Sequence, residues 1–332
     1  MKYILEKLLA KENLTHLEMW DTFTKIMNGE LSEIQMTAFL IALRAKGVTR
    51  EELFTATNIL RDYAEEFPLT DENAIDVCGT GGGKYKLFNI STAVTFVVAT
   101  AGVTVIKHGN RSNANKSGSS DVLQALGVNI KISKEESINK IKEGGVCFLF
   151  APMYHPAMKY VAPVRKDLGI STIFNFLGPL ANPAKVKRQL IGVFNEKLIE
   201  DYIYVLQRLG HKKAIVVHGT DGVDEFSLSS SSKYALLDND KITINTISPE
   251  SVGLKRAKIE DLEGGNPEEN AKIIENILKG NDSSSKADIV AFNAGVALFV
   301  ADKVSSIRDG VKMAKEILKS GKAYAKLKFL ID

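Results

Sequence analysis

The residues best suited to chemistry begin with a glycine run, Gly79 to Gly83, in which four of the five residues are glycine. The apolar run Ala74 to Cys78 precedes it, and polar side chains follow at Asn89, Ser91 and Thr92. This order predicts a strand, a glycine loop and a helix start, where free backbone N–H groups and the helix dipole favour an anion. Glycine also lets the backbone approach a phosphate closely. The stretch therefore predicts a phosphate-ester site.

Two common phosphate-binding motifs do not fit this loop. If Lys84 were the lysine of a Walker loop, Cys78 would occupy a required glycine position and Tyr85 the position of a required hydroxyl. A dinucleotide fingerprint that began at Gly79 would need glycine in place of Lys84. A tight turn without a ligand is the alternative interpretation of these glycines.

A second polar stretch runs from Lys107 to Asp121, after the next predicted strand. Three cations lie in it, Lys107, Arg111 and Lys116, together with a histidine and many hydroxyl and amide groups. An anionic ligand with several oxygens needs such donors. The end of the stretch, Ser117 to Asp121, predicts a helix N-terminus that could bind a further phosphate oxygen. A solvated basic loop is the alternative.

A third loop, Gly219 to Phe226, is acidic and follows a predicted strand. It carries Asp221, Asp224 and Glu225 among glycines. Magnesium prefers oxygen ligands and is usually shared with substrate phosphates. Taken alone, the loop would be interpreted as a plain acidic turn. Beside two phosphate-type loops, it predicts a Mg²⁺ site.

The composition indicates a folded protein without bulk attraction to nucleic acid. The 332 residues suffice for two domains, and 43 basic against 40 acidic residues leave a net charge of only +3. Cys78 and Cys147 both lie in apolar runs, which favours reduced thiols in the cytosol over disulfides. Charges at Glu6 and Lys7 interrupt the first apolar residues, so we expect no signal peptide. We expect a cytoplasmic protein with no membrane span.

The elements that must position these loops fall into two groups. Capping boxes at Thr15–Glu18, Ser32–Gln35 and Thr49–Glu52 precede apolar residues at helical spacing, which predicts a small helical bundle. From Asp71 onward, strand and helix patterns alternate, which predicts a mostly parallel sheet with packed helices. Strands are expected at Ile75–Cys78, Val103–Lys107, Val146–Ala151, Leu190–Phe194 and Ala214–His218, with a hairpin of Tyr234–Leu237 and Lys241–Thr246. Helices are expected at 92–102, 121–126, 134–143, 196–209, 268–278, 286–300 and 307–319.

The predicted fold class is therefore α/β, with a small all-helical lobe and a larger lobe built on the sheet. We expect residues 1–68 to form the helical lobe, joined by about 155–185, which is rich in proline. Residues 71–154 and 186–332 are expected to form the α/β lobe. The ligand site is expected in a cleft between the two lobes.

These stretches together resemble the anthranilate phosphoribosyltransferase family, within the nucleoside phosphorylase/phosphoribosyltransferase superfamily. The resemblance runs from the helical N-terminus to near the C-terminus. The matching motifs are Asn89 to Thr92, Lys107 to Arg111, Lys116 to Ser119, His155 to Lys159, Arg165 to Gly169, Asn175 to Pro183, and the pair Asp224 and Glu225.

The resemblance implies transfer of the phosphoribosyl group of phosphoribosyl pyrophosphate to the amine of anthranilate, in tryptophan biosynthesis. It implies Mg²⁺ held by Ser91, Asp224 and Glu225, and a homodimer formed through the helical lobe, with no nucleic-acid or membrane partner. Phosphoribosyl pyrophosphate is expected to contact Gly79, Gly82, Gly83, Leu87, Asn89, Ile90, Ser91, Thr92, Lys107, His108, Gly109, Asn110, Arg111, Ser112, Asn113, Ala114, Asn115 and Ser119. Anthranilate is expected near Gly79, His108, Asn110, His155, Arg165 and Pro179. No general base is assigned, although His108 could orient the substrate or move a proton.

Three positions depart from the family pattern. Gly83 stands where the family usually has Asp, Leu87 where it often has Thr, and Asn115 where it usually has Ser. We expect activity to be retained with a changed dependence on Mg²⁺. Two alternative functions stay open at this point: a pyrimidine nucleoside phosphorylase, and a non-catalytic relative that binds nucleic acid.

Overall fold

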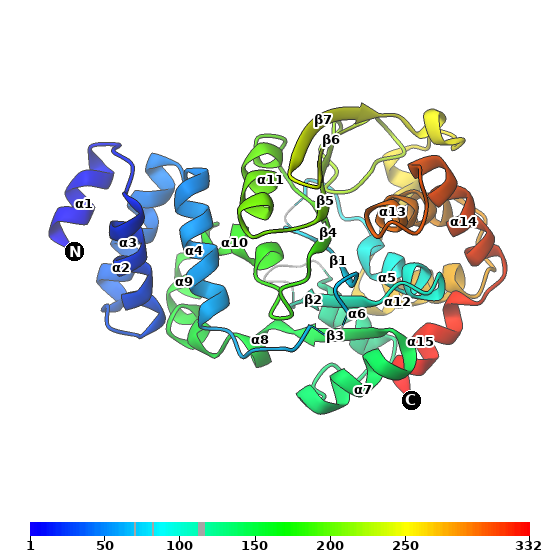
Figure 1. Cartoon of the computed structure of the whole chain (residues 1–332), viewed down its shortest axis with the longest axis horizontal. Coiled ribbons are helices and arrows are strands. Elements are labelled where there is room, and N and C mark those ends of the chain that lie inside the picture. The colour runs from blue at the N-terminus through cyan, green and yellow to red at the C-terminus, as the bar shows by residue number, and fades with distance from the viewer. Residues whose placement is uncertain (70, 82, 112–116) are drawn as a thin grey trace.

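The computed structural model describes residues 1–69, 71–81, 83–111 and 117–332. It contains a small helical lobe, formed by the N-terminal residues, and a larger lobe with helices packed around a sheet (Figure 1). The predicted fold class is confirmed. None of the helices in the described ranges is long and apolar enough to cross a membrane.

The helical lobe begins with α1 (Lys2–Leu9), α2 (His16–Met27), α3 (Glu33–Lys46) and α4 (Arg50–Asp62). The capping boxes at the starts of α2, α3 and α4 are formed as predicted, with Thr15, Ser32 and Thr49 as the N-cap residues. The side chains that the apolar spacing places on one face, such as Phe23 and Phe39, are fully buried. Local sequence patterns therefore account for these helices.

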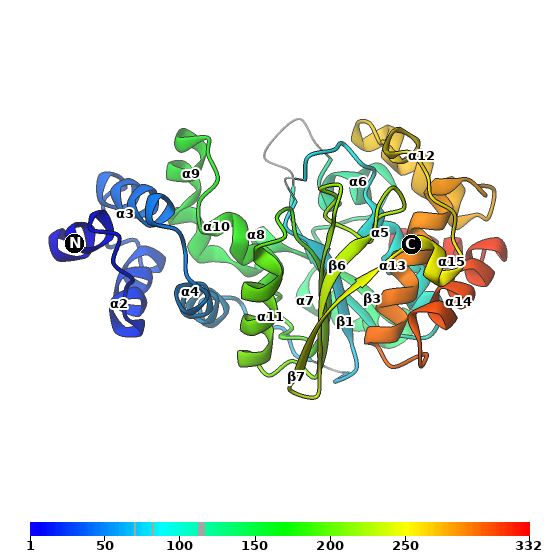
Figure 2. The same ribbon diagram turned by 90° about the horizontal axis from the view of Figure 1, so that it is seen from above.

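A second group of short helices returns to this lobe from the middle of the chain. They are α8 (Ala151–Tyr154), η1 (Pro156–Tyr160), α9 (Ala162–Leu168), α10 (Phe174–Leu177) and η2 (Gly178–Leu180). η1, α9 and α10 pack against α2, α3 and α4, respectively, and lie between the bundle and the sheet in Figure 2. The rings of Phe23 and Phe174 stack with centroids 5.2 Å apart. These contacts favour a helical lobe that is discontinuous in sequence.

The described residues contain one seven-stranded sheet in the order β3-β2-β1-β4-β5-β6-β7. The pairs from β3 to β5 are parallel, and β6 and β7 extend the sheet as an antiparallel hairpin. The bounds are β1 (Ile75–Gly79), β2 (Val105–Gly109), β3 (Val146–Phe150), β4 (Arg188–Gly192), β5 (Lys213–Gly219), β6 (Ser232–Asp238) and β7 (Lys241–Ile247). Each predicted strand is present.

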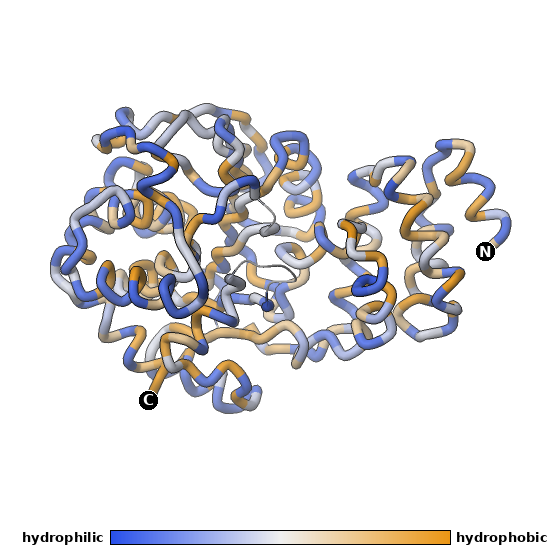
Figure 3. The backbone as a smooth tube through the Cα atoms, turned by 180° about the vertical axis from the view of Figure 1, so that it is seen from behind, coloured by the Kyte–Doolittle hydropathy of each residue, from blue (hydrophilic) through white to orange (hydrophobic). Residues whose placement is uncertain are grey.

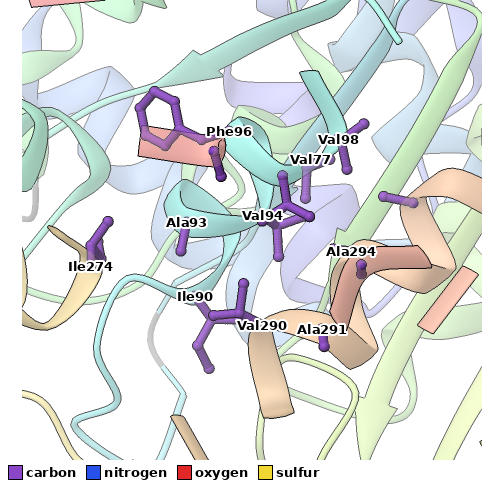
Figure 4. Packing of buried hydrophobic residues seen from close by; sticks show 14 of the residues in the cluster. Val77, Ile90, Ala93, Val94, Phe96, Val98, Ile274, Val290, Ala291 and Ala294 are labelled. Carbon is purple, nitrogen blue, oxygen red and sulfur yellow. The ribbon is translucent and has the colours of Figure 1, made fainter. Parts of the chain in front are cut away.

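The two faces of the sheet are covered by different helices because side chains alternate along each strand. Ile215 and Val217 of β5 belong to one apolar cluster, whereas Ala214 and Val216 belong to another. The first cluster packs on α5 (Ile90–Thr100), α6 (Ser119–Ala125), α12 (Pro267–Leu278), α13 (Ser285–Val300), α14 (Ile307–Lys319) and α15 (Ala323–Ile331). Figure 4 shows part of this packing, and Figure 3 shows hydrophilic segments around the outside of the lobe.

The opposite face of the sheet joins the helical lobe through a continuous apolar cluster. This cluster includes Val216, Tyr202 of α11 (Leu198–Arg208) and Phe23 of the bundle. Beside it, α7 (Lys134–Gly144) covers β3. The sequence patterns do not predict α15, which packs against α5 and α7. The carboxyl ends of the parallel strands meet at one edge, so the three polar loops are brought together there.

Candidate active site

Glycines end four neighbouring strands at this edge, and those of β1, β4 and β5 face the acidic loop. They are Gly79 of β1, Gly109 of β2, Gly192 of β4 and Gly219 of β5. A Cβ atom added at Gly192 would lie 1.7 Å from the carbonyl oxygen of Asp224. A side chain at Gly192 would therefore push the acidic loop away from the end of β4.

The first loop is fixed to its neighbours through Asn89. Its Nδ2 donates to the carbonyl oxygen of Ser117, 2.8 Å away, and its Oδ1 accepts from Nδ2 of Asn270 on α12, 3.1 Å away. Ser91 and Thr92 lie in the first turn of α5. The Thr92 hydroxyl is buried and makes no hydrogen bond with the described residues. The predicted loop-to-helix junction is thus present.

Two predicted contact residues of this loop turn their side chains to the protein interior. Leu87 forms an isolated antiparallel bridge with Glu263 and packs on the large apolar cluster. Ile90 lies in that cluster, near Val290 in Figure 4. Ile90 could therefore contact a ligand only through its backbone, whereas Leu87 is partly buried.

The second loop begins at Asn110 and closes onto α6. Arg111 forms an ion pair with Asp121 at 2.9 Å and also donates to Gln124. Ser119 Oγ lies 3.5 Å from the carbonyl oxygen of Asn110. The predicted contact residues Gly82, Ser112, Asn113, Ala114 and Asn115 lie outside the described residues.

Lys107 lies beneath the first loop, with only 2% of its surface exposed. Its ammonium group donates to the carbonyl oxygen of Val77 and to Ser91 Oγ, the latter at 3.3 Å. Burial lowers the pKa of Lys107, while the charges of Asp76 and Glu225 act to raise it. The side chain links strand β1 to the helix start and faces carboxylates on two sides.

The acidic loop brings two carboxylates together close to Ser91. Burial, with the neighbouring charge of Asp224, raises the pKa of Glu225 to about 8, against the influence of Lys107 and of a hydrogen bond from the Ser91 backbone. Such a carboxylate pair is costly to bury unless a cation offsets its charge. The donor set of Ser91, Asp224 and Glu225 fits Mg²⁺, which prefers oxygen ligands.

Within the described residues, no group of three or more His, Cys, Asp or Glu side chains is arranged to hold a metal ion by itself. This agrees with Mg²⁺ chemistry, because the ion is commonly bound by one or two carboxylates plus substrate phosphates and water. The remaining ligands would then come from an anionic substrate.

His108 and His155 meet at the end of β2, with ring centroids 5.2 Å apart. Burial lowers the pKa of His155 to about 4, and burial together with His155 lowers the pKa of His108 well below its usual value. Both rings are therefore neutral at pH 7. Pro179, in η2, is also buried, and η2 contacts β2. The structure brings these three predicted residues into one region, poor in charge.

Arg165 of α9 is a guanidinium without a protein counter-ion in the described part of the chain. It is partly buried, and its guanidinium carbon lies 5.9 Å from the centre of the Phe174 ring. Burial lowers its pKa, but the group stays protonated, as arginine does in proteins. A partly desolvated guanidinium of this kind favours a carboxylate ligand.

Three buried polar residues beneath the loops, Asp76, Asn182 and Gln189, are absent from the predicted contact residues, although Asn182 lies in the matching motif Asn175 to Pro183. The Asp76 carboxylate of β1 accepts hydrogen bonds from Asn182 Nδ2 at 3.0 Å and from Gln189 Nε2 at 3.3 Å, and from the backbone N–H of His108 at 3.3 Å. A signal was available for Asp76, because it interrupts the apolar run from Ala74 to Cys78. A buried polar residue in such a pattern needs a specific partner.

Comparison with known proteins gives matches over nearly the whole chain. Residues 71–324 match the a/b domain of a glycosyl transferase family, and residues 2–64 match the helical bundle domain of that family. The anthranilate phosphoribosyltransferase of Petrotoga mobilis is 45% identical over 99% of this chain and 96% of its own length. That of Streptococcus mutans is 43% identical over 99% of this chain and 98% of its own length.

Solved structures give the same match. The crystal structure of anthranilate phosphoribosyltransferase from Thermus thermophilus has a TM-score of 0.91 and 39% identity, and covers 98% of this chain and 99% of its own. The Saccharomyces cerevisiae enzyme in complex with phosphoribosyl pyrophosphate and Mg has a TM-score of 0.90 and 26% identity, covering 100% of this chain and 96% of its own.

Proposed function

The chain belongs to the glycosyl transferase family of the anthranilate phosphoribosyltransferases, and we propose that it is an enzyme of this activity. It transfers the phosphoribosyl group of phosphoribosyl pyrophosphate to the amine of anthranilate, giving N-(5-phosphoribosyl)anthranilate and pyrophosphate. This reaction belongs to tryptophan biosynthesis. The structural observation that carries the proposal is the placement of one acidic and two phosphate-type loops at a single sheet edge.

The phosphoribosyl donor would lie across the loops that follow β1 and β2. The first turn of α5 supplies Ser91 and Thr92, and the second loop ends at Ser119 on the first turn of α6. Helix N-termini and hydroxyl groups are suited to phosphate oxygens. Lys107 adds positive charge below the first loop. We assign the pyrophosphate end of the donor to this region.

We propose that Mg²⁺ is held by Asp224, Glu225 and Ser91 together with oxygens of the donor. The bound ion would stabilise negative charge on the departing pyrophosphate. The Saccharomyces enzyme binds phosphoribosyl pyrophosphate with Mg, which supports this assignment.

The acceptor would lie near His108, His155, Pro179 and Arg165. Two neutral imidazoles and a proline provide an environment suited to a flat aromatic ring, and Arg165 can bind a carboxylate with two parallel hydrogen bonds. The Saccharomyces enzyme has also been solved with 4-fluoroanthranilate, an acceptor analogue.

The residues act mainly by position and charge. As the bond from the ribose anomeric carbon to pyrophosphate breaks, that carbon gains positive character, and the amine of anthranilate forms the new bond to it. The nitrogen then releases one proton to solvent, which gives the neutral secondary amine of the product. An aromatic amine is neutral at pH 7, so it must be oriented rather than deprotonated beforehand. The low pKa of His108 means that its buried ring can accept a hydrogen bond without carrying charge. No general base is assigned.

The test is the loss of anthranilate fluorescence with phosphoribosyl pyrophosphate and Mg²⁺. Arg165→Ala should raise the KM for anthranilate about tenfold to hundredfold, because hydrogen bonds to charged groups contribute about 1.5–3 kcal/mol. Arg256→Ala is the matched control, since Arg256 is exposed and pairs with Glu250. An unchanged KM in Arg165→Ala would refute the acceptor assignment.

The two alternative functions have separate tests. A pyrimidine nucleoside phosphorylase would convert thymidine and phosphate, whereas we expect no such turnover. A non-catalytic relative would show salt-dependent binding to oligonucleotide and no turnover of phosphoribosyl pyrophosphate. The full-length similarity to anthranilate phosphoribosyltransferases favours the main proposal over both.

We also propose a cytosolic homodimer formed through the helical lobe. Large apolar side chains are exposed on α1, α2 and α3: Tyr3, Leu9, Leu17, Trp20, Ile34 and Ile41. A lobe with more apolar surface than it can bury is suited to a partner subunit. Residues 1–68 with about 155–185 are proposed to form that lobe. A single monomer peak in analytical ultracentrifugation would contradict the dimer.

A further inference from the structure

A buried polar junction connects the sheet to the segment that enters β4. The junction consists of Asp76 on β1, Gln189 on β4 and Asn182 in the segment. Asp76 and Gln189 are direct neighbours across the two parallel strands. All three side chains are at least nine-tenths buried, on the face of the sheet toward the helical lobe. Apolar residues could fill the same space at no cost for burying polar groups, so the presence of three polar side chains here indicates a specific role.

The junction holds the segment at two points. Gln189 Nε2 donates to the carbonyl oxygen of Pro179 at 2.6 Å as well as to Asp76. Asn182 Nδ2 donates to Asp76 at 3.0 Å and to the carbonyl oxygen of Ile106 on β2 at 2.9 Å. Hydrogen bonds have preferred lengths and directions, so they fix a backbone position more sharply than apolar contact does.

The same carboxylate also connects to the strand that leads to the second loop. Asp76 Oδ1 accepts from the backbone N–H of His108, one residue before the end of β2. His108 in turn lies against His155. The junction therefore links Pro179, on one side of the acceptor region, to His108, on the other side. Neither Gln189 nor Asn182 belongs to the loops that would bind phosphate.

We propose that Gln189 and Asn182 are positioning residues for the acceptor substrate, because they set the distance between the Pro179 segment and the end of β2. This inference rests on the proposed function, since Pro179 and His108 are assigned to the acceptor there. It predicts that loss of the junction affects binding of the acceptor more than binding of the donor. A small displacement of a substrate-positioning wall is costly to the reaction.

The test compares both substrates in Gln189→Met, which keeps the length of the side chain and removes the amide. The KM for anthranilate should rise about tenfold, while the KM for phosphoribosyl pyrophosphate should change less than about twofold. Asn182→Ala should also raise the KM for anthranilate and leave that for phosphoribosyl pyrophosphate nearly unchanged. It replaces Gln189→Met in this test if that variant does not fold. Ile277→Val, in the buried core of α12, is the control for lost stability and should change neither KM.

The outcomes separate this inference from the proposed function. If the wild type turns over its substrates and both variants keep its KM for anthranilate, the positioning role is wrong. The proposed function is then still supported. An equal rise of both KM values would also overturn the positioning role, because that result indicates general loosening. Absence of wild-type turnover would overturn the proposed function, and the positioning role with it.

Discussion

Two buried carboxyl groups that both act on Lys107, Asp76 and Glu225, have different surroundings. Asp76 accepts hydrogen bonds from Asn182, Gln189 and the His108 backbone. Burial raises the pKa of both carboxyl groups, but the donors around Asp76 oppose this rise, whereas the neighbouring carboxylate Asp224 adds to it at Glu225. A carboxylate with several donors is complete within the protein, whereas a pair of carboxylates calls for a cation. We therefore expect Asp76 to have a structural role and Glu225 to bind a ligand cation.

Lys107 connects the two regions. Its pKa reflects the charges of both Asp76 and Glu225, although it donates hydrogen bonds to Val77 and Ser91. The Lys107 ammonium group therefore offsets the negative charge of Asp76 and also that of the acidic loop. Substitution of Lys107, and then substitutions in the acidic loop alone, test whether Asp76 and Glu225 have different roles.

Replacement of the shared charge should have the largest effect. Lys107→Met leaves two buried carboxylates without their nearest cation and should lower the free energy of unfolding by about 3–5 kcal/mol. Urea denaturation measures this change. Lys212→Met is the matched control: the Lys212–Glu72 pair is exposed, so we expect a loss below about 1 kcal/mol. Equal losses in the two variants would show that Lys107 is not a shared counter-ion.

Replacement on the acidic side should affect activity rather than folding. Glu225→Gln removes one proposed Mg²⁺ ligand and should lower kcat/KM by about 10²-fold or more. In EDTA its melting temperature should not fall below that of the wild type, because burial and Asp224 already disfavour the charged form of Glu225, and glutamine is neutral. Added Mg²⁺ with pyrophosphate should raise the melting temperature of the wild type only.

Glu260→Gln, an exposed carboxylate in η4 (Ile259–Leu262), is the control for this experiment. It should keep both the activity and the response to Mg²⁺. If Glu225→Gln unfolds at a much lower temperature in EDTA, Glu225 resembles Asp76 and the contrast between the two regions fails.

The smallest effect is expected from restoring the family residue with Gly83→Asp. A Cβ atom at Gly83 would lie 2.7 Å from Asp224 Oδ1, so Asp224 must move and a third carboxylate joins the acidic side. The Mg²⁺ concentration for half-maximal activity should shift about two- to tenfold, equivalent to roughly 0.4–1.4 kcal/mol. Gly83→Asn separates the steric effect from the charge. Superimposable Mg²⁺ curves for wild type and Gly83→Asp would disprove this expectation.

Much of the fold could be predicted because its signals are local. The N-cap side chains of Thr15, Ser32 and Thr49 each accept a hydrogen bond from the backbone N–H three residues later. The alternation from Asp71 onward predicted the strands, including the β6–β7 hairpin. The C-terminal helix α15 was missed. Its packing against α5 and α7 comes from contacts distant in sequence, which a local pattern does not contain.

The candidate site was predicted in part, and its contact residues remain predictions. The polar loops were identifiable because glycines, cations and carboxylates gather there in ways that suit an anion. The interior orientations of Leu87 and Ile90 were not identifiable, since they depend on packing with Glu263 and α13. The position of Lys107 was likewise set by strands and a helix that meet only in the folded chain.

By itself, the sequence determined the helical caps, the strand-loop-helix order around Gly79 and the chemical character of the three loops. These features are satisfied by residues a few positions apart. The pair Asp224 and Glu225 is adjacent in the sequence, but only the tertiary structure decided that Asp76 accepts from Asn182 and Gln189, and that Glu225 is buried near Lys107 and Ser91. The two carboxylates are the same chemical group, and what distinguishes them is the set of distant residues that the fold places around each one.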